Sequence, residues 1–159
     1  MKIEDILKLK KEGKLEEARE GILKLLEANP NDSEILLQAA FIHDQLGYAP
    51  QAITFYQQAL DSNLEEDDRK EALLCLGSSY RAVGLYDEAR ETLEIGMSEY
   101  PNENVFYIFF ALTLYNLDDA DLAMEIVLTK LLETTSDKSI LKYKNALEFY
   151  ASRLDETFN

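Results

Sequence analysis

The sequence predicts an all-α protein built as an array of packed helix pairs. Landmark residues recur at a nearly fixed interval: Gly13 and Gly47 are 34 residues apart, Gly47 and Gly84 are 37 apart, and Ala89 and Ala123 are again 34 apart. Such periods indicate repeated units of secondary structure. Within each period, apolar residues are spaced three and four apart, as on one face of a helix. Only six glycines and three prolines occur in 159 residues, which favours long helices over many short strands.

Residues 73–101 form the clearest single unit. Leu73, Leu76 and Tyr80 share one face of a predicted first helix, and Gly77 on that side lets a second helix come close. Gly84 is expected to end this helix in the left-handed conformation, which costs glycine no Cβ clash. The second helix is expected to face the first with small and apolar residues and to end before a proline: Ala89, Leu93, Gly96 and Pro101.

This order of residues resembles the tetratricopeptide repeat family, position by position. The resemblance implies a right-handed superhelical array of helix pairs, an alpha-alpha superhelix. The stretches YQQALDSNL, FFALTLYNLDDADLAMEIVL and YASRLDE are also similar to a family of small bacterial tetratricopeptide-repeat proteins, over about residues 45–155. That second resemblance implies a dimeric, all-helical protein with no assigned activity.

The period divides the chain into four repeats and a C-terminal helix. Three extra residues fall between Leu64 and Leu73, as a longer helix start or a loop. Ser33 is the predicted N-cap of the second repeat, and Asp118 takes the place of the turn glycine in the fourth. In the first repeat, Ile6 stands where a small residue belongs. The predicted boundaries are about 1–32, 33–66, 67–103 and 104–135 for the repeats, and 136–155 for the capping helix.

The C-terminal segment predicts one helix with a narrow apolar stripe. The simplest interpretation is a cap that covers the last apolar surface of the array. The alternative is that part of the stripe, or Phe149 on its flank, meets another chain. The predicted stripe consists of Ile140, Tyr143, Leu147, Tyr150 and Leu154.

Composition excludes several classes of function. The net charge of −15 repels DNA, RNA and anionic membrane surfaces. The first 14 residues are charged throughout, unlike a signal peptide or an anchor, so a cytoplasmic protein is expected. Cys75 is the only cysteine, which excludes an intramolecular disulfide, and it is expected to be a buried or half-buried packing residue.

No motif in the sequence points to catalysis, a metal or a cofactor, and none of the three is expected. His43 is the only histidine and has no partner at metal-ligand spacing, so we expect it to fill the inter-helix position of the repeat's tyrosine. Asp118, Asp119 and Asp121 lack the glycine and the distal glutamate of a calcium-binding loop. An enzyme or metal-binding protein is therefore the remote alternative.

The family resemblance places a candidate binding groove on the first helices of the repeats. Repeat proteins that clamp chaperone C-terminal carboxylates use Lys and Asn there, and this chain has mainly apolar residues, so that function is not expected. Either neighbouring repeats cover these side chains, or they bind an apolar segment of a partner or of a second copy in a homodimer. The predicted function is a non-catalytic protein-interaction scaffold, with a dedicated chaperone of a secreted or assembly-prone protein as the alternative. The predicted groove residues are Leu37, Phe41, Asp44, Leu74, Ser78, Arg81, Ile108, Leu112 and Tyr115.

Overall fold

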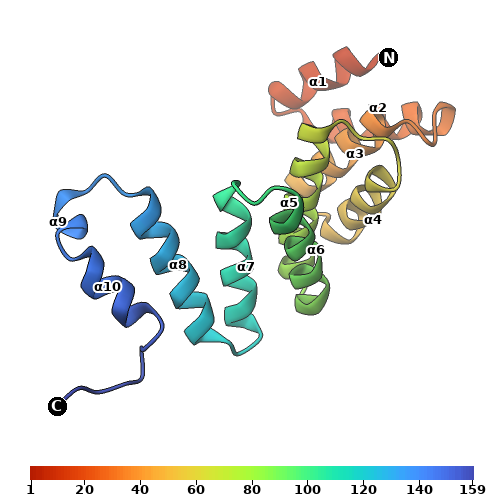
Figure 1. The fold of residues 1–159 in the computed structure, drawn as a ribbon. Helices are drawn as coiled ribbons and strands as arrows, with labels where there is room; N and C mark the ends of the chain where they lie inside the picture. Colours follow the sequence, from red (N-terminus) through yellow and green to blue (C-terminus); the bar gives the residue numbers. More distant parts are fainter. The chain divides into compact units, whose positions relative to one another are not determined.

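The computed structural model describes all residues, 1–159, and contains helices and turns but no strand (Figure 1). Its contacts divide the chain into two compact units, Met1–Thr92 and Leu93–Asn159. Helix α6 begins in the first unit and ends in the second. No helix is long and apolar enough to cross a membrane. The helices are α1 (Ile3–Lys11), α2 (Leu15–Ala28), α3 (Ser33–Gln45), α4 (Ala49–Leu60), α5 (Glu66–Ala82), α6 (Tyr86–Glu99), α7 (Asn104–Asn116), α8 (Ala120–Thr134), α9 (Lys138–Leu141) and α10 (Lys144–Ala151).

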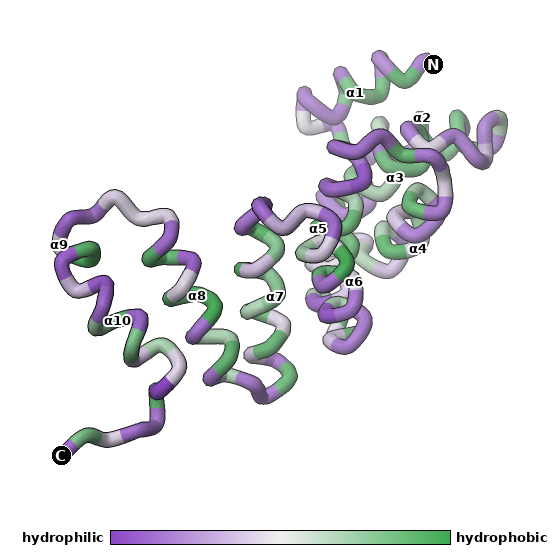
Figure 2. The backbone as a smooth tube through the Cα atoms, in the orientation of Figure 1, coloured by the Kyte–Doolittle hydropathy of each residue, from purple (hydrophilic) through white to green (hydrophobic).

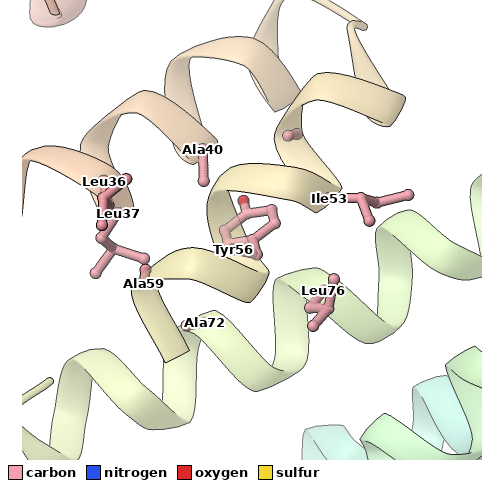
Figure 3. Packing of buried hydrophobic residues seen from close by; sticks show 9 residues of the cluster. Leu36, Leu37, Ala40, Ile53, Tyr56, Ala59, Ala72 and Leu76 are labelled. Carbon is pink, nitrogen blue, oxygen red and sulfur yellow. The ribbon is translucent and has the colours of Figure 1, made fainter. Parts of the chain in front are cut away.

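In the first unit, each helix from α1 to α4 packs against the next one along the chain. Tyr56 of α4 is fully buried and lies among small and aliphatic side chains of α3, α4 and α5 (Figure 3). Ala40 and Ala59 leave room for its ring, and Leu76 packs in the same cluster from α5. The repeat pattern of one large residue among small ones therefore builds this core.

Four tight turns with the same geometry end the first helix of each repeat. Gly13, Gly47 and Gly84 have φ between +75° and +82°, and Asp118 has φ +61°. The predicted left-handed residues at Gly84 and Asp118 are confirmed. In each turn, the amide that follows this residue donates to the carbonyl five residues back, which satisfies an otherwise free helix-end carbonyl. The four bonds run from Lys14 to Leu9, Tyr48 to His43, Leu85 to Tyr80, and Asp119 to Leu114.

The inserted residues of the third repeat lie in a helix. α5 has 17 residues, whereas the corresponding helices α3 and α7 have 13 each. The extra length lies at the N-terminal end, where Glu66, Asp67 and Asp68 form the first turn. Carboxylates are favoured there by the helix dipole. The sequence was compatible with either a longer helix start or a loop, and the structure shows the helix.

Two local predictions are wrong. The cap of α3 is Asp32, whose carboxylate accepts a hydrogen bond from the Ile35 amide, so Ser33 is already the first helical residue. Gly96 was expected to face the first helix of its own repeat. Instead, a Cβ built on Gly96 would clash with the ring of Phe106 in α7, so Gly96 makes room for the first helix of the following repeat.

In the irregular first repeat, a large residue on α1 faces a glycine on α2. Ile6 is fully buried although a small residue is typical at its position. It packs against α2 at Gly21, where an added Cβ would lie 3.1 Å from Ile6 Cγ1. The large residue on α1 is therefore accommodated by a missing side chain on α2.

In the second unit, α7 packs along α8, and α8 packs along α10. α7 is hydrophobic over most of its length (Figure 2). The C-terminal segment is not the single helix that the sequence predicted: α9 and α10 are separated at Lys142 and Tyr143, and α10 ends at Ala151. Tyr143 and Tyr150 are exposed, so these two members of the predicted stripe are not buried against α8.

Candidate protein-binding surface

The predicted groove residues fall into two groups, one in each unit. Leu37, Phe41, Asp44, Leu74, Ser78 and Arg81 belong to the first unit, and Ile108, Leu112 and Tyr115 to the second. The first group is largely covered. Leu37 is only 2% exposed and is part of the core around Tyr56, so the prediction that it lines an open groove is wrong. The other five side chains of this group are half-buried.

Phe41 is covered by a lysine from the neighbouring helix. Its ring meets Tyr56 edge-on at 5.9 Å between centroids, and Lys10 Nζ lies 4.9 Å from the Phe41 ring centroid. The Lys10 ammonium also donates a hydrogen bond to the Gln38 side chain at 3.1 Å. Burial lowers the pKa of Lys10. A partner could reach the Phe41 ring fully only by displacing this cation.

Asp44 has a structural role in the first unit. Its carboxylate accepts a hydrogen bond from the Tyr56 hydroxyl at 3.0 Å and one from the Ser79 hydroxyl at 3.5 Å. These bonds connect α3, α4 and α5. Asp44 satisfies the polar end of the buried tyrosine, which would otherwise lose its hydrogen bonds to water. It is therefore occupied by groups of its own unit.

The second group lies on one exposed face of α7. Leu112 is 41% exposed and Tyr115 is 67% exposed, with Ile108 half-buried beside them. Val105, 40% exposed, extends the same face by one turn. Spacings of three and four residues align these four side chains along the helix. We name them the α7 stripe. Val105 was not among the predicted groove residues, although the same spacing, continued backwards from Ile108, reaches it.

The opposite face of α7 is buried in the core. Phe106, Phe110, Ala111 and Leu114 are buried there. Phe106 stacks on Tyr100 with 6.2 Å between ring centroids. Because this face already anchors α7, the fold does not require large apolar groups along the α7 stripe. Exposed apolar patches that folding does not require usually mark contact with a partner.

His43 fills the space between helices, as predicted. It is buried, its ring lies 4.9 Å from that of Phe55, and its Nδ1 lies 2.7 Å from the Ala39 carbonyl. A carbonyl can only accept, so Nδ1 carries the proton. Nε2 then accepts the hydrogen bond from Arg19 Nε at 3.3 Å. This arrangement suits the neutral imidazole, and burial, with the Arg19 charge as a smaller cause, lowers the pKa of His43.

Acidification is therefore expected to destabilise the first unit. The unfolded chain binds the His43 proton with the ordinary pKa near 6.5, while the folded state binds it only at lower pH. The contribution of His43 is fully present above pH 6.5 and is lost as the pH falls towards the folded-state pKa. Because His43 is the only histidine, its imidazole signals in NMR spectra are unambiguous and should titrate below pH 6.5. A folded-state pKa above 6.5 would contradict the expectation that burial and the Arg19 charge disfavour the protonated imidazole.

A variant that differs only at His43 isolates its share of the acid sensitivity. His43→Gln keeps a side chain that can accept from Arg19 but does not titrate. Between pH 7.5 and 5.5, the free energy of unfolding should fall less in His43→Gln than in the unchanged protein. Equal slopes would assign the acid sensitivity to other groups.

Cys75 has no features of a reactive thiol. It is half-buried, and burial, together with the charge of Glu71, raises its pKa to about 12. The thiol therefore stays protonated at neutral pH, whereas nucleophilic cysteines need a lowered pKa.

Comparisons with known proteins agree with the repeat architecture. The family profile described as "Tetratrico peptide repeat" matches residues 33–154, which is most of the chain. The protein therefore belongs to the tetratricopeptide repeat family. Proteins of this family are generally non-catalytic modules that bind other proteins.

Solved structures of MamA have a similar fold. The structure described as "Crystal structure of MamA" has a TM-score of 0.73 and 22% sequence identity, over 91% of this chain and 86% of that one. The structure "MamA RS-1 ArsTM double mutant" has a TM-score of 0.74 and 21% identity, over 96% of this chain and 83% of that one. At this identity the likeness concerns the fold. A comparison with curated proteins found no similar sequence.

Proposed function

We propose that this protein is a cytoplasmic, non-catalytic scaffold that binds an apolar segment of a partner protein along the α7 stripe. The observation that carries the proposal is the row formed by the exposed Val105, Leu112 and Tyr115 and the half-buried Ile108, on a helix whose other face is buried. The spacing of three and four residues matches the seam that one amphipathic helix offers to another. A helical partner segment with the same spacing is therefore the best fit.

In this proposal, the first unit does not contribute to the binding surface. Leu37 is buried in its core, Lys10 covers Phe41, and Asp44 is bonded to Tyr56 and Ser79, so these three residues support the fold. The binding surface thus contracts from the predicted nine residues to the α7 stripe. Burying one large apolar side chain at such an interface stabilises a complex by roughly 1.5–3 kcal/mol, and a few such anchors dominate the affinity of protein interfaces.

Leu112→Asp is expected to weaken partner binding at least tenfold while leaving the helix content intact. A carboxylate in the middle of the stripe would lose its hydration on binding, whereas in the free protein it faces water. The measurement is capture of partners from native extract, quantified by mass spectrometry, together with circular dichroism. Sedimentation equilibrium reports on a second copy as the partner, because a homodimer has twice the chain mass of 18.2 kDa.

Leu114→Asp is the matched control on the same helix. Leu114 is buried, so a carboxylate there should unfold the second unit. If Leu112→Asp unfolds the protein in the same way, the stripe is part of the core. If Leu112→Asp folds and both partner capture and self-association are unchanged, the α7 stripe is not the binding surface.

A further inference from the structure

Three aromatic side chains form an open cluster at the C-terminal end of the second unit. The ring centroids of Phe149 and Tyr150 are 5.6 Å apart, and Phe158 lies 5.5 Å from the first and 5.9 Å from the second. All three side chains are about half exposed. We name them the aromatic platform. The platform lies outside the α7 stripe, and the proposed scaffold function does not use it.

One cation of the chain already rests on this platform. The Arg153 guanidinium carbon lies 4.2 Å from the centre of the Phe149 ring. Its Nη1 donates hydrogen bonds to the Phe149 carbonyl at 2.8 Å and to the Ser152 hydroxyl at 3.2 Å. The face of an aromatic ring attracts a guanidinium electrostatically. Arg153 thus demonstrates the chemistry of the platform, while Tyr150 and Phe158 still offer open ring surface.

An acidic cavity is connected to the platform by Arg153, which lines the cavity and lies against the Phe149 ring. It has a volume of about 460 Å³ and lies between the start of α8 and residues 151–156. Arg153 is the only basic residue in its lining and is directed to Phe149. No carboxylate of the lining forms an ion pair with a lysine or arginine, and Asp155 raises the pKa of Asp121 by a hydrogen bond and by its charge. The carboxylates are those of Asp119, Asp121, Glu125, Asp155 and Glu156.

We propose that the aromatic platform and the acidic cavity together form a second docking surface, for a peptide segment that carries arginine or lysine next to an aromatic residue. The basic side chain enters the cavity, and the neighbouring aromatic side chain packs on Tyr150 and Phe158. This surface is independent of the α7 stripe. The protein would then hold two different partner segments, one apolar and one basic.

Charge complementarity selects this occupant. The carboxylates of the cavity lack a cation, and a concave site concentrates their field more than a flat surface does. A metal ion fits less well, because no group of three or more potential metal ligands converges in the structure. The aromatic platform gives a further reason for a peptide, since a bare ion makes no use of exposed rings.

The test uses fluorescence anisotropy with three synthetic peptides of equal length in Gly-Ser spacers. Their central residues are Arg-Phe-Arg, Arg-Ala-Arg and Glu-Phe-Glu. We expect binding of the first, at least tenfold weaker binding of the second, and none of the third. Raising the salt concentration should weaken the first complex, because the interacting charges are close to solvent. Equal affinity for all three peptides would overturn the proposal.

Two variants locate the binding site. Asp121→Asn/Asp155→Asn and Phe158→Ala should each weaken Arg-Phe-Arg binding at least tenfold, with unchanged circular dichroism. Glu65→Gln/Asp68→Asn removes the same charge from an exposed place in the first unit and should not affect it. If that control weakens binding equally, the peptide responds only to net charge and the proposal fails.

Two further measurements distinguish this surface from the α7 stripe and from a cation site. Leu112→Asp should leave Arg-Phe-Arg binding unchanged, so a failed α7 stripe and a failed second surface give distinguishable results. Calorimetry with calcium chloride alone should show no binding that depends on Asp121 and Asp155. Such binding would instead identify the cavity as a cation site and contradict a peptide occupant.

Discussion

Tyr56→Ala is expected to lower the free energy of unfolding by about 3–5 kcal/mol, as large aromatic truncations in cores do. The ring is fully buried among residues of α3, α4 and α5, and it supports Phe41 edge-on. Its removal leaves a cavity that three helices would have to move to fill. Urea unfolding followed by circular dichroism measures the change. Most single domains are stable by only about 5–15 kcal/mol, so the variant should lose a large part of its stability.

Tyr56→Phe provides the matched control. It keeps the ring and removes only the hydroxyl that donates to Asp44. Asp44 is half-buried and can recover a water, so the loss should be about 1 kcal/mol. If Tyr56→Ala costs no more than Tyr56→Phe, the ring does not fill the core as Figure 3 shows.

Gly96→Ala is expected to destabilise the second unit, although alanine is the better helix former. Replacing a mid-helix glycine by alanine gains about 0.5–1 kcal/mol of helix propensity. The new methyl group, however, would overlap the ring of Phe106, which is fully buried and stacked on Tyr100. Overpacking of this kind costs about 1–3 kcal/mol. The cost of overpacking should therefore exceed the gain in helix propensity. Thermal unfolding measures the net change as a lower melting temperature.

Gly21→Ala is the same substitution at a position where the nearest side chain is more flexible. There the new methyl would meet Met1 Sδ at 2.8 Å, in an exposed and flexible side chain, and the buried Ile6 Cγ1 at 3.1 Å. The methionine can turn away and Ile6 needs to shift only slightly, so the gain in helix propensity should offset most of the cost. If both glycine variants behave alike, contact with Phe106 is not the reason for a glycine at position 96.

The sequence predicted the repeated part of the fold because each repeat carries its own local signals. Gly84 and Asp118 mark turns whose conformation depends on one residue, and the interval between landmarks fixed the place of the inserted residues. The family comparison then confirmed the type of repeat. Signals of this kind depend little on distant parts of the chain, so they can be interpreted without a structure.

Burial of the candidate groove could not be predicted in the same way. Phe41 and Leu112 occupy equivalent positions in their helices, yet the first is half-buried beside Lys10 and the second is exposed. The difference depends on which side chains the neighbouring helices provide. The break between α9 and α10 has no glycine or proline to mark it, and nothing in the structure explains why it falls at Lys142 and Tyr143. The spacing of residues along the chain therefore predicts neither the burial of Phe41 nor the break between α9 and α10.

The lengthened start of α5 has a consequence for how such chains change in evolution and can be engineered. Residues added at the start of α5 leave Leu73, Leu76 and Tyr80 in their mutual phase. Insertions at this end thus keep the packed face of the helix in register, whereas one residue added after Leu73 would rotate the following side chains by about 100°. The exposed acidic turn at Glu66 is accordingly the place to graft a reporter peptide or a further helical turn.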